Sequence, residues 1–219
     1  IGSMTWKSGE DGIRGYKFTY DNMSRMKNAI YGEGTSITPP TGKNFSENVI
    51  GYDHNGNITG LQRYGKVSGS TYGKIDDLSL TYVGNQLNNV TDAATDPLYN
   101  GAFNFVDGNK TSIQEYKYDA NGNLEQDYNK KLTKIQYNLL NLPSALQLTS
   151  GHRIDYLYSS DGMKRRVTHK TAIANISVPM GQIKDLTGSQ ISQTHITDYC
   201  GNVIYENGTL SKILTEEGY

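Results

Sequence analysis

The chain has 219 residues, of which 35% are apolar, and a formal net charge of −1 at pH 7. This length can bury a core in one large or two small domains. The near-neutral charge argues against a nucleic-acid-binding protein, which usually carries a basic surface. No apolar run reaches the length of a membrane span, and no signal segment opens the chain. Since Ile1 lies inside an apparent strand, we expect a piece of a longer protein.

Alternating aromatic and polar residues predict the first strand of a hairpin near the N-terminus. Tyr16, Phe18 and Tyr20 fall on one face, whereas Lys17 and Thr19 fall on the other. A period of two is typical of a half-buried β-strand. The same alternation precedes later turns, in residues 116–118, 135–139 and 154–158.

A short phrase, in which a strand-end tyrosine is followed by a turn, recurs along the chain. The clearest copies run from Tyr52 to Ile58 and from Tyr118 to Leu124, and each contains Asn-Gly-Asn. Weaker copies begin at Tyr20, Tyr82, Tyr137, Tyr158 and Tyr199. Because the alternation resumes after each turn, every copy predicts a strand, a turn and a return strand, which is a β-hairpin.

The turn residues have mechanical roles in this interpretation. An aspartate before the bend, such as Asp53, can accept hydrogen bonds from amides two residues on, and the asparagine after the bend can act similarly. Glycine allows the positive φ that such turns require. We predict that the residues of the repeated turns are structural and not catalytic: Tyr52, Asp53, Gly56, Asn57, Tyr118, Asp119, Gly122, Asn123, Tyr158, Gly162, Tyr199 and Gly201.

The spacing of the strand-end tyrosines indicates a repeat of about twenty residues. The intervals from Tyr118 to Tyr137 and on to Tyr158 are 19 and 21 residues, and the interval of 41 to Tyr199 predicts two units, one of them degenerate. Longer early intervals predict loop insertions near 32–42, 65–73 and 93–108. We therefore expect an all-β fold, with consecutive antiparallel hairpins forming one long, curved or spiralling sheet in a single domain over 1–219.

These residues resemble the RHS/YD-repeat family, which is named for rearrangement hotspots and for the Tyr-Asp pair seen here at Tyr52-Asp53 and Tyr118-Asp119. The resemblance extends from Tyr16 to about Leu210. It implies a sheet that spirals into a hollow shell in a large secreted or cell-surface protein. In bacterial polymorphic toxins and insecticidal toxin complexes such a shell encloses a C-terminal toxic domain, and the teneurins use a related shell in adhesion.

The resemblance implies a partial YD-repeat shell that scaffolds or encapsulates a C-terminal effector domain without being an enzyme. Its partners would be the rest of its own polypeptide, namely further repeats and the effector. Family shells often end in an Asp-Pro-x-Gly type motif, but Asp96-Pro97 is followed here by Leu98-Tyr99. We therefore expect the cleavage module and the effector to lie outside this chain. Open sheet edges would also permit pairing between copies of the chain.

Metal and cofactor sites are not expected. The segments from Asp53 to Asn57 and from Asp119 to Asn123 are similar to the start of a calcium loop. However, their glycine is fourth rather than sixth, and no glutamate stands at the twelfth position. The four histidines share no metal-ligand spacing.

An enzyme is not expected either. Adjacent carboxylates such as Asp76-Asp77 and Glu216-Glu217 would point to opposite faces of a strand, whereas a glycosidase needs two carboxylates across one cleft. Cys200 has no evident base beside it, which predicts a structural role. The basic run Lys164-Arg165-Arg166 would alternate between faces, so no nucleic-acid partner is expected.

A carbohydrate-binding or adhesive surface module is the alternative function. Regularly spaced tyrosines, together with Trp6, could present flat apolar faces with polar tips, on which sugars stack. The same tyrosines could instead pack between strands as cross-strand pairs. The burial of the strand-end tyrosine rings distinguishes the two, and glycans are the partners that the alternative implies.

Overall fold

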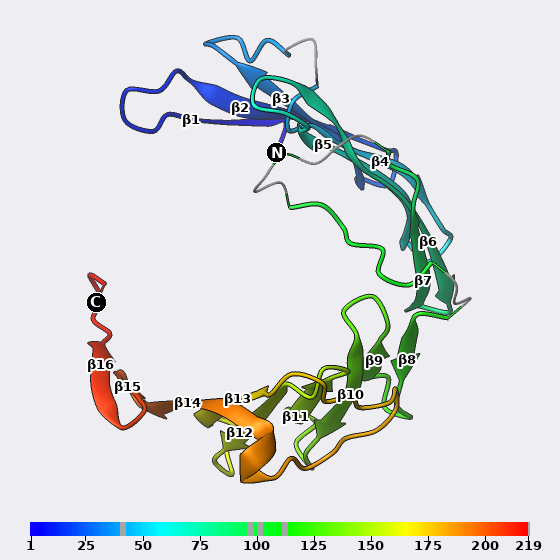
Figure 1. Cartoon of the computed structure of the whole chain (residues 1–219). Helices are drawn as coiled ribbons and strands as arrows, with labels where there is room; N and C mark the ends of the chain where they lie inside the picture. The colour runs from blue at the N-terminus through cyan, green and yellow to red at the C-terminus, as the bar shows by residue number, and fades with distance from the viewer. Residues whose placement is uncertain (40–42, 96–98, 100–102, 111–113, 219) are drawn as a thin grey trace. The chain divides into compact units, whose positions relative to one another are not determined.

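The structure, a computed structural model, describes residues 1–39, 43–95, 99, 103–110 and 114–218. The chain forms two compact units, Ile1–Ile113 and Gln114–Tyr219, each of which contains one antiparallel sheet. The first sheet has the order β1-β2-β3-β4-β5-β6-β7 and the second the order β16-β15-β14-β13-β12-β11-β10-β9-β8 (Figure 1). The predicted all-β array of consecutive antiparallel hairpins is confirmed, divided between two sheets that are not closed into barrels.

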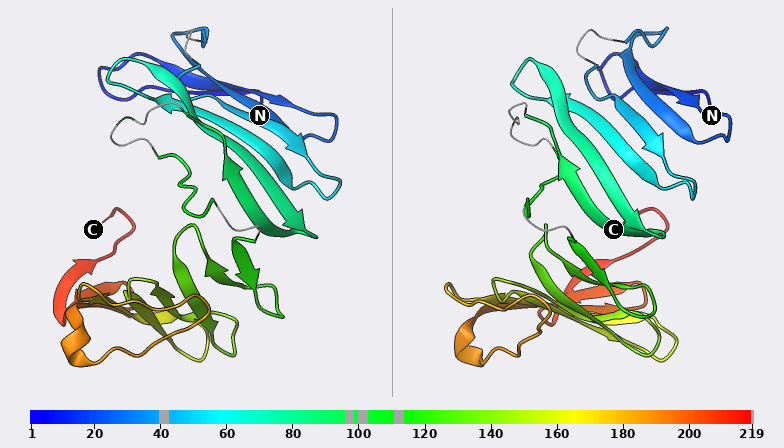
Figure 2. Two further views of the ribbon diagram at one scale, coloured as in Figure 1. Left: turned by 45° about the vertical axis from the view of Figure 1, so that its right-hand side comes forward. Right: turned by 90° about the vertical axis from the view of Figure 1, so that its right-hand side faces the viewer.

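Neighbours in each sheet are also neighbours in the sequence, and Figure 2 shows the twist of the long strands β5 to β7. The strands of the first sheet are β1 (Ser3–Trp6), β2 (Arg14–Tyr20), β3 (Met26–Glu33), β4 (Glu47–Tyr52), β5 (Ile58–Lys66), β6 (Tyr72–Val83) and β7 (Gln86–Asp92). The strands of the second sheet are β8 (Tyr116–Tyr118), β9 (Leu124–Asp127), β10 (Leu132–Tyr137), β11 (Pro143–Leu148), β12 (Arg153–Tyr158), β13 (Lys164–Ala172), β14 (Ile191–Cys200), β15 (Val203–Glu206) and β16 (Thr209–Ile213). A 3₁₀ turn, η1 (Gly188–Gln190), precedes β14.

The strand-end tyrosines lie where the repeated phrase places them. Five of them are the last residues of β2, β4, β8, β10 and β12, and Tyr82 and Tyr199 are the last but one of β6 and β14. Each is followed by a turn and a return strand, as in β4 to β5, where Tyr52 pairs with Ile58 across the turn. The hairpin interpretation of the phrase is therefore confirmed.

The degenerate hairpin expected between Tyr158 and Tyr199 is absent, so that prediction was wrong. The interval instead contains the long strands β13 and β14 and a connection, residues 173–190, that we call the second crossing segment. It runs across a face of the second sheet, since its backbone bonds to residues of β10 and to Thr149 after β11. The interval between Tyr158 and Tyr199 is long because the second crossing segment must cross several strands of the sheet and return.

The predicted insertions at 32–42 and 65–73 overlap connections between strands, although their outer residues belong to β3, β5 and β6. Residues 67–71 join β5 to β6, and residues 34–46 join β3 to β4. Residues 93–110 form the first crossing segment, which contains no strand in its described residues 93–95, 99 and 103–110. The Asp96-Pro97 pair lies outside the described residues, as do residues 40–42.

Aliphatic and aromatic side chains share the core with polar ones. Among the described residues the buried hydrophobic side chains of the first unit are Ala29, Tyr31, Ile37, Val49, Ile75, Leu78 and Val90, and those of the second are Tyr116, Leu132, Ala145, Val167, Ala172 and Val178. Glycine lets the chain pack closely at Gly15 and Gly32, where a Cβ would approach side-chain atoms of Ile37 to 2.6 and 2.7 Å. The connection after β3 therefore folds back onto the sheet at these two glycines.

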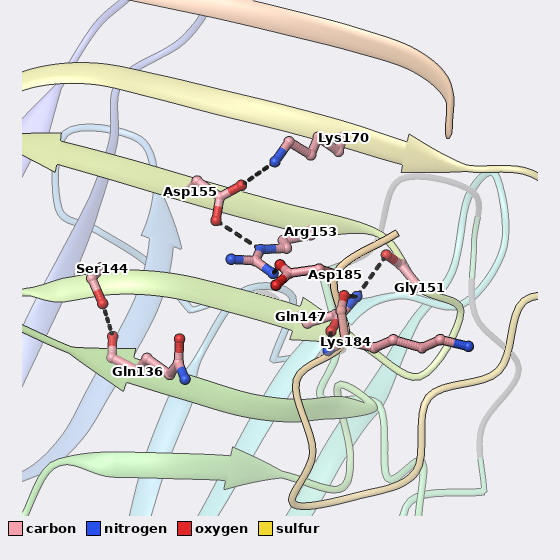
Figure 3. Close-up of polar contacts among 9 residues, drawn as sticks. All are labelled: Gln136, Ser144, Gln147, Gly151, Arg153, Asp155, Lys170, Lys184 and Asp185. Carbon is pink, nitrogen blue, oxygen red and sulfur yellow. Dashed lines mark hydrogen bonds and ion pairs between the residues drawn. The ribbon is translucent and has the colours of Figure 1, made fainter. Parts of the chain in front are cut away.

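Buried polar side chains hold the second crossing segment against its sheet (Figure 3). The fully buried amide of Gln147 on β11 donates to the carbonyl of Lys184 at 3.0 Å and accepts from the Lys184 amide at 2.6 Å. Thr133 on β10, also fully buried, donates to the carbonyl of Gln182 at 2.9 Å. Arg153 on β12 pairs with Asp185 of the segment. Since buried polar groups must find partners, these contacts explain how a chain with few aliphatic residues still forms a tight layer.

Candidate functional site

Five of the strand-end tyrosines are followed by one recurring five-residue turn. In each, the amide of the first residue donates to the carbonyl of the fifth, and the amide of the fourth donates to the carbonyl of the first. The fourth residue has a positive φ in every case, between 60° and 88°. These turns begin at Asp21, Asp53, Asp119, Asn138 and Ser159.

The carboxylates of these turns are acceptors for their own backbone. In Asp53, Oδ1 accepts from the amides of Asn55 at 2.9 Å and Asn57 at 2.8 Å, and Oδ2 accepts from Asn57 Nδ2 at 2.8 Å. Asp119 makes the same three contacts with Asn121 and Asn123. The hydrogen bond from the following asparagine side chain is the largest cause that lowers the pKa of each aspartate. Both carboxylates are therefore engaged in closing the turn.

The other two repeated turns are tighter. Gly84-Asn85 and Gly201-Asn202 connect β6 to β7 and β14 to β15 with two residues each. Gly84 and Gly201 have φ of 61° and 65°, which is the first central position of a type II′ hairpin turn. Cys200 is the exposed last residue of β14, immediately before the second of these turns.

Three of the strand-end tyrosines connect their hairpin to the one before it by a hydrogen bond. Their hydroxyls donate to the carbonyl of the first residue of the preceding return strand, in the pairs Tyr52 to Met26 (2.5 Å), Tyr82 to Ile58 (2.9 Å) and Tyr137 to Leu124 (2.8 Å). Cations reinforce the same contact, because Arg25 lies 4.4 Å from the centre of the Tyr52 ring and Lys164 lies 5.0 Å from that of Tyr199. The tyrosine at the end of the first strand of one hairpin is thus packed beside the turn of the preceding hairpin.

Asparagine side chains link turns that lie side by side at the ends of the strands. Asn57 Nδ2 donates to Asn85 Oδ1 at 3.1 Å. Asn123 and Asn141 exchange amide hydrogen bonds of 2.6 and 3.1 Å. The predicted turn residues Asn57 and Asn123 therefore act both within their own turn and on the next one.

A separate feature of the first unit is a pocket of about 460 Å³, which we call the aromatic pocket. It lies among β2, β4, β5, β6, the connection before β4 and the first crossing segment. Its lining consists of Tyr16, Phe45, Glu47, Arg63, Tyr64, Gly65, Lys66, Ile75, Tyr99 and Phe103. No sequence pattern groups these residues, because five separate stretches of the chain contribute them.

Edge-to-face ring contacts hold one wall of the aromatic pocket. The Phe45 ring lies 5.3 Å from that of Tyr31 and 5.1 Å from that of Tyr72, nearly perpendicular to both. The Tyr16 hydroxyl donates to the carbonyl of Phe45 at 3.0 Å. The Ile75 side chain packs directly against Gly65, since a Cβ at Gly65 would lie 2.8 Å from Ile75 Cδ1. The wall is therefore preformed by contacts within the sheet.

A buried ion pair fixes the opposite side of the pocket. Arg63 Nη2 lies 2.6 Å from Asp76 Oδ2 and donates to the carbonyl of Phe103 at 2.9 Å. Asp76 is completely buried, which raises the pKa of its carboxyl group, and its Oδ1 accepts from the Phe105 amide. The ion pair thus anchors the first crossing segment on β5 and β6.

Two charged side chains of the pocket lining, Glu47 and Lys66, have no such anchoring in an ion pair among the described residues. The Glu47 carboxylate makes no hydrogen bond or ion pair among the described residues, although its charge raises the pKa of Tyr16, second to burial. The Lys66 ammonium lies 5.6 Å from the centre of the Tyr99 ring. The pocket therefore offers one acceptor group and one donor group beside its aromatic faces.

The structure does not assemble a carboxylate pair from the adjacent acids of the sequence. Asp76 pairs with Arg63 under the first crossing segment, whereas Asp77 accepts from Lys74 at 2.7 Å and from Gln62 at 2.9 Å. Within the described residues, no group of three or more His, Cys, Asp or Glu side chains could hold a metal ion. His169 and His195 are cross-strand neighbours, with ring centres 6.4 Å apart.

Comparison with protein-family models and with curated proteins gives no match to this sequence. In the part of the chain that the structure describes, no helix has the length and apolar character needed to cross a membrane.

Proposed function

We propose that this chain is a non-enzymatic structural repeat module of a secreted or cell-surface protein of the RHS/YD-repeat type. Its role is to scaffold or encapsulate a C-terminal effector domain. The observation that carries this proposal is the contact between neighbouring repeats, in which a strand-end tyrosine hydroxyl donates to the carbonyl after the preceding turn.

The repeated residues are used within the array rather than presented outward. Six of the seven strand-end tyrosines are half-buried, and only Tyr20 is exposed, at 43%. The turn aspartates are occupied by backbone amides, and the turn asparagines by each other. Arrays in which each unit contacts mainly its neighbours extend by adding units, which suits a scaffold or a wall.

The coding sequence downstream of Tyr219 and the protease sensitivity of its product test this proposal. We expect an open reading frame that continues into a further domain, and we expect that domain to resist proteolysis until the repeats are cut. A stop codon directly after Tyr219, or an adjoining domain that is digested as fast in the full-length protein as in isolation, would overturn encapsulation.

The alternative function, a carbohydrate-binding or adhesive module, would not use the strand-end tyrosines as its platform, because neighbouring hairpins cover much of their rings. The aromatic pocket is the one observation that favours it, since its rings are not committed to the repeat contacts.

A further inference from the structure

We propose that the aromatic pocket of the first unit is a binding site for a neutral saccharide. The proposal goes beyond the scaffold function and does not depend on it, because the residues of the pocket are not those of the repeated turns. Its volume of about 460 Å³ falls within the range of small-molecule sites, about 300–1,000 Å³.

The pocket leaves aromatic surface open that a ligand could cover. Phe45 and Tyr99 are 40% and 41% exposed, and Phe103 at the rim is 88% exposed. Aromatic rings grouped in a hollow mark a binding surface more often than scattered exposed apolar residues do. The C–H face of a pyranose ring is flat and apolar, so it can stack on such rings while its hydroxyls point outward.

The charges around the pocket favour a ligand without net charge. Arg63 and Asp76 neutralise each other, so the lining keeps one negative group, Glu47, and one positive group, Lys66. A second ammonium, that of Lys43, lies beside the lining, 4.9 Å from the centre of the Tyr64 ring. A cationic ligand would compete with Lys66 for the Tyr99 face, where that ammonium already lies. An anionic ligand would meet the unpaired Glu47 carboxylate. A neutral polyol is repelled by neither charge.

Glu47 and Lys66 also supply the polar contacts that such a ligand needs. A carboxylate accepts hydrogen bonds and an ammonium donates them. Together they can pair with sugar hydroxyl groups that donate and with those that accept. The Tyr64 hydroxyl, which accepts from Lys43 at 3.3 Å, is a third polar group on the lining. A few placed polar groups beside apolar walls are the usual composition of a ligand pocket.

Calorimetric titration of the 219-residue chain with defined probes tests the proposal. The neutral probes are maltotriose, cellotriose, laminaritriose, mannotriose and N,N′,N″-triacetylchitotriose. The charged probes are 3′-sialyllactose as an anion and choline as a cation. We expect saturable binding of at least one neutral trisaccharide and no binding of the two charged probes at the same concentrations.

Substitutions at the rim locate the binding. We expect Tyr99→Ala and Phe103→Ala each to weaken it by about twofold to tenfold, as the loss of one stacking contact implies. Glu47→Gln should weaken it by about tenfold, because a hydrogen bond to a charged acceptor is lost. Leu139→Ala, at a fully exposed apolar residue of the second unit, is the matched control and should change nothing. Thermal unfolding of each variant shows whether its fold is intact.

Several results would overturn the site. These are failure of all neutral probes to bind, binding of only 3′-sialyllactose or choline, or binding that Tyr99→Ala, Phe103→Ala and Glu47→Gln leave unchanged. A failure of saccharide binding says nothing against the scaffold, since the scaffold proposal is tested by the downstream sequence and its protease protection.

Discussion

The Tyr137 hydroxyl donates a hydrogen bond of 2.8 Å to the carbonyl of Leu124. This bond joins the end of β10 to the start of β9, which is the return strand of the preceding hairpin. The same bond occurs in the first sheet between Tyr82 and Ile58. A single side-chain hydroxyl therefore converts a local turn motif into a contact between repeats. The stability of each sheet should depend on these hydroxyls.

Removing the Tyr137 hydroxyl should destabilise the second unit. We expect Tyr137→Phe to lower its free energy of unfolding by about 0.5–1.5 kcal/mol, the usual net contribution of one hydrogen bond. Tyr158→Phe is a matched control, because Tyr158 holds the same place in its repeat while its hydroxyl makes no hydrogen bond among the described residues. Urea unfolding of both variants measures the difference. Equal effects of the two substitutions would contradict a structural role for the inter-repeat bond.

The glycine at the fourth position of the five-residue turn should be required because of its positive φ, and not because a side chain there would clash with a neighbour. Gly56 has φ of 88°, and a Cβ there would meet no atom within 4 Å. We expect Gly56→Ala to cost about 1–2 kcal/mol, the cost of placing an L-residue in the left-handed region. Gly56→Asn should cost less, since Asn141 occupies the equivalent position with φ of 61°.

Thermal or urea unfolding would compare the two Gly56 variants with Gly69→Ala. Gly69 lies in the loop between β5 and β6, also with open space around it, but without a positive φ. That control should leave the stability unchanged or raise it slightly. A loss at Gly69 as large as that at Gly56 would mean that loop flexibility, and not the turn conformation, decides the effect.

The turn aspartates should make stability depend on pH in acid. The pKa of Asp119 is lower in the folded protein than its usual value of 3.8, first because of the Asn123 side-chain hydrogen bond. Its contribution is therefore present above that usual value and is lost as pH falls through the folded pKa. Asn138 makes the equivalent amide contacts in the next turn, so Asp119→Asn should keep the turn while removing this titration.

Urea unfolding of the wild type and of Asp119→Asn at about pH 6 and about pH 3 measures this dependence. We expect the stability advantage of the wild type over the variant to shrink at the lower pH. An advantage that stays constant or grows toward acid would show that the Asp119 carboxylate does not stabilise the folded turn.

The buried amide of Gln147 should hold the second crossing segment in place. Gln147→Leu leaves the carbonyl of the buried residue Gly151, and the amide and carbonyl of Lys184, without this partner. A buried polar group left unsatisfied costs about 1–3 kcal/mol. Hydrogen exchange should accelerate selectively in residues 173–190. Gln136→Leu, at an exposed residue of the neighbouring strand β10, is the control and should leave exchange in that segment unchanged. Uniform acceleration over the whole unit would instead indicate global destabilisation.

The hairpins and their turns were predictable because their causes are local. Alternation around Tyr116 and Tyr118, an aspartate before the bend and a glycine four residues into the turn each act within a few residues, and the structure places strands and turns accordingly. The crossing segments were not predictable in the same way. Residues 173–190 have no periodic pattern of their own. They are held by Thr133 and Gln147, which lie 49 and 37 positions before the residues that they contact.

The order of the strands, the all-β class and the turn chemistry thus follow from the amino-acid sequence alone, because neighbouring residues determine them. The division into two sheets, the tyrosine bonds between repeats and the aromatic pocket follow only from the folded arrangement. Each of these joins residues that are distant in the chain, as in the pocket, where Tyr16, Arg63 and Phe103 meet. Periodicity shows which face of a strand is apolar, but the partner that covers that face is set by packing across the whole unit.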